Sequence, residues 1–291
     1  MANHQDLFLC TSETPFSFTK HSSIGVGGTS RVAYYPETEE QLKRLVLHLY
    51  QTEQPFYVLG NLTNVLPCDN HVKKPVLRTT RLRDIQITQD GLYVSAGVSA
   101  GAFLRECKRL QLGGAEFLVG IPCTMGGALF MNAGASGEYL APFIKSVKVL
   151  YRGKEEILPA AACQYAYKQS VFMQEEAVIV GATFALLNMP TPQIEQRTKY
   201  FLQKRAHLPK GKSMGCVFKN PNGVSAGKLI ESAGLKGLRI GGAVISEKHA
   251  NFILNDANAT GADIKSLITV MKNAVFAQYK IRLEEEIRYI T

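Results

Sequence analysis

The stretch GIPCTMGGALFMNAGA, residues 120–135, decides the fold class, because an ordinary packed core does not concentrate glycine in this way. Seven glycines fall within the 25 residues from Gly113 to Gly137. Such a density indicates backbone with positive φ, or backbone that approaches a ligand closely. A second turn, LGNLTNVL at residues 59–66, follows an apolar run that is typical of a buried strand (55–59). Two such turns favour a ligand cradle over the alternative, tight turns in a compact core.

Consecutive backbone N–H groups in such turns form nests that suit a diphosphate, and the hydroxyls of Thr63 and Thr124 can add hydrogen bonds. The familiar nucleotide-binding motifs are absent. Ser30 stands where the stretch beginning at Gly25 would need the last glycine of G-x-G-x-x-G, and the chain has no P-loop pattern. The six histidines do not cluster at metal-ligand spacing, so we expect no metal site.

Helix and strand patterns alternate along the chain, which indicates a mixed α and β fold. An amphipathic helix is predicted over 37–50, with Thr38 and Gln41 in a capping-box pattern. Thr191 is expected to cap the next helix, which should run to about His207. Thr260 and Asp263 open a long helix near the C-terminus.

Length and linkers predict two domains. The 291 residues are about twice the typical domain length, and the proline-rich linker 188–192 is the best boundary. We therefore expect a first domain over 1–190, built from subdomains of about 1–78 and 79–190, and a second domain over 191–291.

Composition limits the compartment and the partners. No apolar run approaches the ~20 residues needed to cross a bilayer, and the N-terminus lacks the pattern of a secretory signal. The six cysteines include no C-x-x-C pair, which suits a reducing compartment, so a cytoplasmic protein without a membrane partner is expected. The net charge of +9 comes from dispersed basic residues, which favours small anionic ligands over nucleic acid.

Several segments together resemble the UDP-N-acetylenolpyruvoylglucosamine reductase (MurB) family. Residues 59–66 resemble its L-G-x-G-S-N-x-L turn, and residues 120–135 resemble its G-I-P-G-x-x-G-G-A…M-N-A-G-A segment. The stretch SMGCVFKNP at 213–221 is similar to S-x-G-S-x-F-K-N-P, and residues 226–237 and 246–255 match closely as well. The resemblance spans roughly residues 15–290 and is that of the more compact subtype.

The resemblance implies an α+β architecture: an FAD-binding fold of the vanillyl-alcohol-oxidase (PCMH) type in two subdomains, plus a C-terminal α/β substrate-binding domain. It implies FAD and NADPH as cofactors. It further implies a reaction in which the enolpyruvyl ether of a UDP-sugar is reduced to UDP-N-acetylmuramate for peptidoglycan synthesis. Partners would be these small molecules, and a monomer is expected.

Three catalytic residues follow from the resemblance, and two of them differ in type from the family's residue. Lys168 stands where the family has an arginine that stabilises the enolate, so the charge is kept but the bidentate fork is lost. Cys216 stands where the family has a proton-donating serine. Glu286 matches the family's glutamate, although strand spacing alone does not choose between Glu284 and Glu286.

A thiol, with an unperturbed pKa of about 8.5, is a more acidic donor than an alcohol, but a thiolate donates nothing. We therefore predict that activity falls at high pH as Cys216 ionises. The alternatives without a catalytic role are that Cys216 is a buried cysteine acting as a small hydrophobe, that Lys168 is a solvated surface lysine, and that Glu286 belongs to an acidic solvated tail.

The remaining site residues are also implied by the resemblance. The cofactor-binding set comprises Leu59, Gly60, Asn61, Leu62, Thr63, Asn64, Gly120, Ile121, Pro122, Thr124, Gly126, Gly127, Ala128, Asn132, Gly134 and Tyr167. The substrate-binding set comprises Lys219, Asn220, His207, Lys228 and Lys248.

Two departures from the family lie in the turns themselves. Asn61 and Thr63 stand for the Gly-Ser of the first turn, and asparagine tolerates a left-handed backbone better than most residues. Cys123 replaces a glycine of the second turn with no evident compensation. A related flavoprotein with a different substrate, or a catalytically silent nucleotide-sugar binder, stays open as an alternative.

Overall fold

The computed structural model describes residues 10–291, which contacts divide into two compact units. The first unit contains the segment ending at Thr14, then Val32–Asn61 and Lys74–Ala206, and the second contains Pro15–Arg31, Leu62–Lys73 and His207–Thr291. The assignment of residues 1–190 to one functional domain and of residues 191–291 to another stays a prediction. The expectation about a secretory signal concerns residues outside the described part of the chain. No helix in the described range has the length and apolar character needed to span a bilayer.

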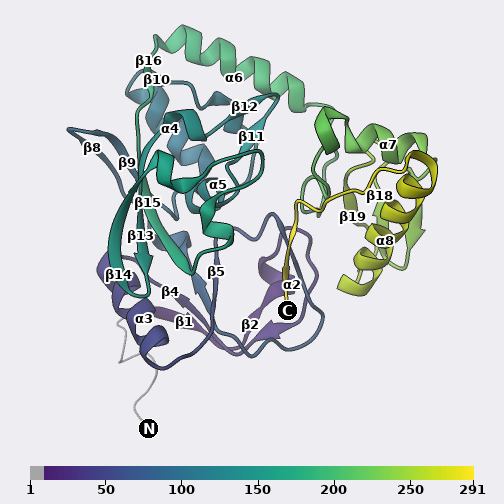
Figure 1. The fold of residues 1–291 in the computed structure, drawn as a ribbon, viewed down its shortest axis with the longest axis horizontal. Helices are drawn as coiled ribbons and strands as arrows, with labels where there is room; N and C mark the ends of the chain where they lie inside the picture. Colours follow the sequence, from purple (N-terminus) through teal and green to yellow (C-terminus); the bar gives the residue numbers. More distant parts are fainter. Residues whose placement is uncertain (1–9) are drawn as a thin grey trace. The chain divides into compact units, whose positions relative to one another are not determined.

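Two sheets form the frame of the first unit (Figure 1). The larger sheet is antiparallel and has the order β14 (Lys154–Pro159), β13 (Ile144–Tyr151), β15 (Ala177–Phe184), β9 (Gly91–Ser95) and β8 (Ile85–Thr88). The smaller sheet has the order β1 (Thr11–Glu13), β4 (Ala33–Tyr35), β7 (Val76–Arg78) and β5 (Tyr57–Leu59). Its last two pairings are parallel, and Leu59 at the start of the first turn lies opposite Arg78.

Helices cover both faces of the larger sheet. On one face α4 (Ala100–Arg109), α5 (Met125–Phe130) and α6 (Thr191–Arg205) contribute Phe103, Leu129 and Phe201 to one core. On the other face α3 (Glu39–Gln51) packs Leu42, Leu45, Val46 and Leu49 into a second core with Leu150 and Val178 of the sheet. The helix α5, which is part of the glycine-rich segment, is thus packed against the larger sheet.

Short pairs of strands complete the first unit. They are β10 (Leu112–Gly113) with β16 (Leu187–Asn188), and β11 (Gly134–Ala135) with β12 (Glu138–Tyr139). The predicted cap of α6 is wrong: Pro190 occupies the N-cap and Thr191 is already helical, with no side-chain cap bond. The proline at the second helical position presets φ there, so the helix starts without a capping hydroxyl.

The second unit has its own core around α8 (Gly261–Tyr279). The helix start predicted at Thr260 and Asp263 is confirmed, and the structure shows a capping box there: the Thr260 side chain accepts from the Asp263 amide, and the Asp263 side chain accepts from the Thr260 amide. Figure 1 shows α7 (Ala226–Ser232) and α8 beside β18 (Ala243–Ile245) and β19 (Ile253–Asn255). These strands belong to an antiparallel sheet in which β18 pairs with β17 (Arg239–Ile240) on one side and with β19 on the other. The other elements are α2 (Phe18–His21), β2 (Phe16–Ser17), β3 (Thr29–Ser30), β6 (Val65–Pro67) and β20 (Arg288–Ile290).

Candidate active site

The start of the first turn, at residues 59–61, meets the second turn within the first unit. The Asn61 side-chain amide donates to the Pro122 carbonyl at 3.1 Å. A Cβ added to Gly60 would lie 2.2 Å from the Thr124 hydroxyl oxygen, so only glycine allows this approach. The close contact between turns 60 residues apart supports a shared binding surface, as their composition indicates.

This contact leads to a first prediction. We expect Gly60→Ala to raise the dissociation constant for FAD by about tenfold or more, because overpacking at a close contact costs about 1–3 kcal/mol. Flavin titration by fluorescence quenching measures it. Gly101→Ala is the matched control, since the nearest atom to its added Cβ is 3.7 Å away in a flexible arginine. Equal FAD affinity in Gly60→Ala and wild type would show that the turn contact does not shape the cofactor site.

Most amides at the start of α5 already have protein acceptors. Met125 donates to the Val98 carbonyl and Gly126 to the Ala96 carbonyl, each at 2.8 Å. The Gly127 amide donates to the Thr124 hydroxyl at 3.3 Å. The first two bonds anchor the second turn to the segment after β9. Fewer backbone amides are therefore available to bind an anion than the run of glycines suggests.

The first turn reaches its left-handed backbone at a residue other than the expected one. The positive φ falls on Leu62, at 51°, and not on Asn61. Leu62 is buried, and its carbonyl accepts the amide of Ser23 at 3.2 Å. A left-handed conformation in leucine costs of order 1 kcal/mol and persists because these contacts within the second unit hold it.

Lys168 also lies in a strained backbone, with φ at 53°. The flanking residues Ala166 and Gln169 exchange two backbone hydrogen bonds of 3.1 and 3.2 Å, which close a tight turn around Lys168. The turn is tied to the end of α5 by the buried Asn132, whose amide donates to the Ala166 carbonyl at 2.9 Å. Strain of about 1–3 kcal/mol at a fixed turn is a common feature of functional positions.

Asn132 and Ser170 act as structural ties for this turn. The Asn132 side-chain oxygen accepts the Ala141 amide at 3.1 Å, so both ends of its carboxamide are used by backbone. The Ser170 hydroxyl donates to the Phe130 carbonyl at 2.6 Å, and Ser170 is fully buried. The exposed Tyr167 packs edge-on against Tyr139 of β12. The cofactor contacts predicted for Asn132 and Tyr167 stay a prediction.

The positive charges of Lys168 and Arg205 both influence the Cys123 thiol. Burial raises the pKa of the Cys123 thiol to about 11, while a backbone hydrogen bond and the charges of Lys168 and Arg205 act in the opposite direction. The thiol is therefore protonated at neutral pH. Arg205 at the end of α6 also donates to the Gly120 carbonyl at 3.2 Å. The structure thus brings the lysine turn, the second glycine turn and α6 together.

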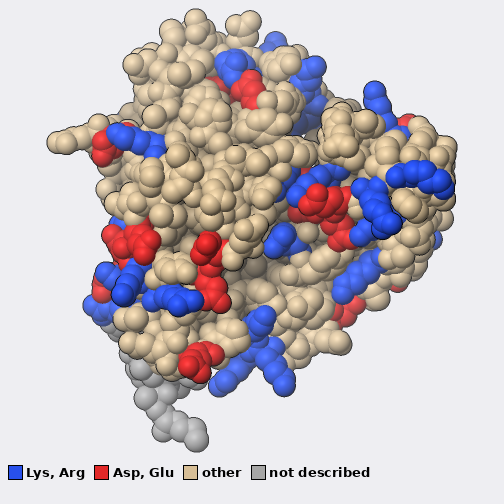
Figure 2. Space-filling model, in the orientation of Figure 1, with Lys and Arg blue, Asp and Glu red and all other residues tan. Residues whose placement is uncertain are grey.

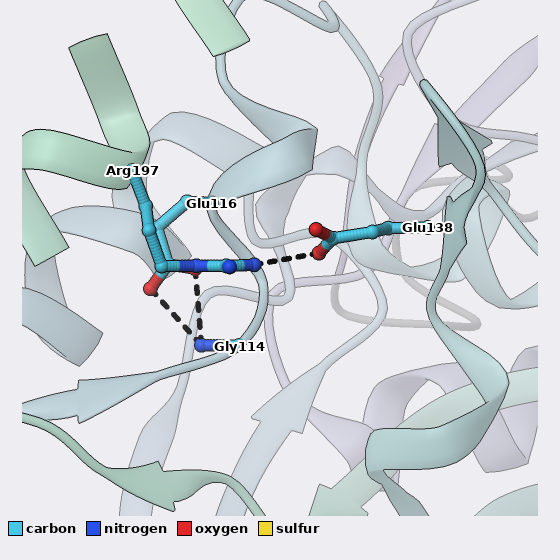
Figure 3. A network of polar contacts seen from close by, with 4 residues as sticks. All are labelled: Gly114, Glu116, Glu138 and Arg197. Atoms are coloured by element: carbon cyan, nitrogen blue, oxygen red, sulfur yellow. Dashed lines mark hydrogen bonds and ion pairs between the residues drawn. The ribbon is translucent and has the colours of Figure 1, made fainter. Parts of the chain in front are cut away.

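An ionic network that sequence reasoning missed braces the glycine-rich segment (Figure 3). The Arg197 guanidinium of α6 lies between two carboxylates, 2.8 Å from Glu116 and 2.7 Å from Glu138. Glu116 is buried and both its oxygens accept the Gly114 amide, at 3.0 and 3.1 Å. The signal was available, because Glu116 is the single charged residue between Gly113 and Gly137.

Removing Arg197 should destabilise the fold. We expect Arg197→Met to lower the free energy of unfolding by about 2 kcal/mol, because it leaves the buried Glu116 carboxylate without its counter-charge, although Arg197 itself is partly screened by solvent. Adding Glu116→Gln should recover part of the loss. Urea denaturation measures both. Arg44→Met on α3, which breaks an exposed pair with Glu40, is the control and should change stability by less than about 0.5 kcal/mol. A similar effect for both arginines would contradict the bracing role.

In the second unit, the segments that carry Cys216 and Glu286 lie side by side. The Glu286 amide donates to the Val217 carbonyl at 2.8 Å, and the Lys219 amide donates to the Glu284 carbonyl at 2.9 Å. Phe218 and Glu285 form the antiparallel bridge between these bonds. Glu286 therefore lies opposite Val217, the residue that follows Cys216, although Cys216 and Glu286 are 70 positions apart in the chain.

The end of the first turn belongs to the same cluster. The Asn64 carboxamide donates to the Glu286 carbonyl at 3.1 Å, and the Asn64 carbonyl accepts the Arg288 amide at 3.0 Å. The parallel pairing of β6 with β20 continues this contact. A predicted cofactor-binding residue and a predicted catalytic residue are thus in direct contact.

The predicted substrate residues have varied surroundings. Lys219 pairs with Glu284, and the Asn220 side chain accepts the Ala226 amide at the start of α7. Lys228 and Lys248 are exposed. Figure 2 shows lysine and arginine side chains interspersed with acidic ones on the surface over α7 and α8.

His207 and His249 stack at 6.1 Å between ring centroids. Burial, together with the neighbouring His207, lowers the pKa of His249. The half-buried ring is therefore mostly neutral at neutral pH, and its Nδ1 can accept a hydrogen bond. The described residues hold no group of three or more metal-ligating side chains.

Comparison with known proteins connects both units to one enzyme family. Residues 30–159 match the FAD binding domain family, and residues 206–290 match the C-terminal domain of UDP-N-acetylenolpyruvoylglucosamine reductase. The reductase of Clostridium botulinum is 34% identical over 274 residues, covering 93% of this chain and 90% of that protein. The reductase of Caldanaerobacter subterraneus is also 34% identical, over the same share of this chain.

A solved structure extends the likeness to the fold. The crystal structure of the reductase from Thermus caldophilus superposes with a TM-score of 0.83 at 32% identity, covering 97% of this chain and 99% of the other. The α+β fold and the FAD-binding architecture expected from the sequence are thereby confirmed.

Proposed function

The chain belongs to the UDP-N-acetylenolpyruvoylglucosamine reductase (MurB) family of FAD-dependent oxidoreductases, and we propose that it uses NADPH to reduce the enolpyruvyl ether of its UDP-sugar to UDP-N-acetylmuramate for peptidoglycan synthesis. The observation that carries this proposal is the hydrogen-bonded register of the Cys216 and Glu286 segments. This register supports the proposal because the segments that carry the Cys216 thiol and the Glu286 carboxylate are adjacent, and a site that protonates a substrate carbon would use such groups.

The residues of the first unit fit an FAD site. Gly60 has no side chain, which lets the first turn approach the Thr124 hydroxyl of the second turn closely, and this supports a cofactor surface made largely of backbone. The residues that would hold FAD are those of the turns 59–64 and 120–128, together with Asn132, Gly134 and Tyr167. When bound, FAD supplies hydride transfer from NADPH to the substrate double bond.

Lys168 supplies fixed positive charge. Hydride addition to the enolpyruvyl group drives negative charge onto the substrate carboxylate, and an ammonium group held in a rigid turn stabilises that charge as it develops. The tight turn around Lys168 and its ties to α5 support this role, because they fix the backbone before the substrate binds.

Cys216 supplies the proton to the substrate carbon, and Glu286 assists from the adjacent segment. The thiol must be protonated to act, so the protonation step should weaken as pH rises through the pKa of the thiol. Lys219, Asn220, His207, Lys228 and Lys248 would bind the UDP-sugar. The enzyme would act as a cytoplasmic monomer.

Product analysis tests the proposal. We expect the purified protein with FAD, NADPH and the enolpyruvyl UDP-sugar to yield a product heavier by two hydrogens, identified by mass spectrometry as UDP-N-acetylmuramate. NADPH oxidation without conversion of the sugar would instead favour a flavoprotein with a different substrate. The absence of any bound flavin and of NADPH oxidation would favour a silent nucleotide-sugar binder.

A further inference from the structure

One buried side chain holds the backbone directly after Cys216. Asn251 is 2% exposed and lies just before β19. Its side-chain oxygen accepts the Phe218 amide at 2.9 Å, and its side-chain nitrogen donates to the Phe218 carbonyl at 2.8 Å. Its backbone carbonyl accepts the Val217 amide at 2.9 Å. Three hydrogen bonds from one residue therefore fix the two positions that follow Cys216.

The other edge of the same segment is bonded to the strand that carries Glu286. Because the Val217 carbonyl and the Lys219 amide bond to that strand, the segment after Cys216 lies between Glu286 on one side and Asn251 on the other. The Asn251 carboxamide takes the place of a peptide group in a neighbouring strand. It offers a donor and an acceptor to one residue, which no aliphatic or acidic side chain can do.

Asn251 is itself held in place. The Asn251 backbone amide donates to the Nδ1 atom of His249 at 3.3 Å. The Phe252 backbone amide donates to the His249 carbonyl at 3.0 Å, which closes the turn. The ring of His249 packs against Phe252 and His207. The carboxamide is therefore presented in one orientation by a packed turn.

We propose that Asn251 is a positioning residue for Cys216, which fixes the thiol relative to Glu286 so that it can donate its proton to the substrate carbon. This inference rests on the proposed function and deepens it, because it identifies what sets the geometry of the donor. Proton transfer depends on placement, and a displacement of about 1 Å can cost about 100-fold in rate.

Asn251→Ala tests the proposal against a matched control. The change leaves the buried Phe218 amide and carbonyl without partners. The control is Asn255→Ala in β19, whose side chain also makes three bonds to backbone, donating to Ile24 and Gly25 and accepting from Ala259, but none to the segment after Cys216. Thermal unfolding of both variants shows whether they fold equally well.

The first readout does not depend on catalysis. Alkylation of Cys216 by iodoacetamide, followed by peptide mass spectrometry on the FAD-loaded protein, should be about fivefold faster in Asn251→Ala than in wild type or Asn255→Ala, because the released segment opens more often. An unchanged alkylation rate in Asn251→Ala would overturn the positioning role.

The second readout separates positioning from general structural damage. Asn251→Ala should slow flavin reoxidation by the enolpyruvyl UDP-sugar by about 100-fold, and the double variant Cys216→Ala/Asn251→Ala should be no slower than Cys216→Ala by more than about twofold. Additive losses would mean that Asn251 acts through the fold in general and would overturn the proposal.

The two proposals can fail separately. If Cys216→Ala itself leaves reoxidation unchanged, the donor role in the proposed function fails, and the alkylation rates still decide whether Asn251 holds the thiol. If Cys216→Ala is slow and Asn251→Ala is normal in both readouts, the proposed function stands and the positioning role of Asn251 fails.

Discussion

Cys216→Ala is expected to slow reoxidation of the reduced flavin by the enolpyruvyl UDP-sugar about 10²–10⁴-fold, while reduction of the flavin by NADPH changes little. The reason is that the thiol acts only on the carbon that the substrate presents. Anaerobic stopped-flow absorbance at the flavin band measures the two half-reactions separately. Similar reoxidation rates in Cys216→Ala and wild type would refute the donor role.

Cys216→Ser is the matched variant, because a hydroxyl can also donate a proton, and it should stay active. The pH profiles of the two active forms should differ. The thiol donor should lose activity as pH rises through its pKa, whereas an alcohol does not ionise in that range. Cys68→Ala is the control for removal of a thiol elsewhere, and its reoxidation rate should equal that of wild type.

Lys168→Met is expected to lower the rate of the substrate half-reaction by about 10²–10³-fold, because it removes the charge that stabilises the developing enolate at nearly constant volume. Lys168→Arg should be tolerated, since the charge is kept. Single-turnover reoxidation at saturating substrate separates this effect from weaker binding. Lys145→Met, which removes an exposed lysine paired with Asp90, should have no effect. Normal turnover in Lys168→Met would make Lys168 an ordinary surface residue.

Local patterns predicted the elements that depend on local physics. The apolar stripe of α3 and the start of α8 at Thr260 and Asp263 were both found as predicted, because helix periodicity and capping involve residues three or four apart. The N-cap of α6 was misplaced by one residue, because Pro192 presets a helical φ at the second helical position, so that Thr191 is already helical and no capping hydroxyl is used.

The site was predictable only in part. Composition marked the two Gly/Asn-rich turns, and the contact of Asn61 with Pro122 joins them, but the sequence did not specify this contact. The left-handed residue of the first turn, Leu62, stands at the second glycine of the L-G-x-G-S-N-x-L pattern, so the register marked this position although Asn61 was expected to fill it. The bonds of Asn251 to Phe218 also join segments far apart in the chain, and no local pattern encodes them.

The central claim is that this chain transfers a hydride through FAD from NADPH to an enolpyruvyl double bond. The most direct test is an anaerobic titration of the wild-type protein loaded with FAD. NADPH should bleach the visible flavin band, and the enolpyruvyl UDP-sugar, but not UDP-N-acetylglucosamine, should restore it in one equivalent. A band that NADPH bleaches and the enolpyruvyl sugar leaves bleached would contradict the account.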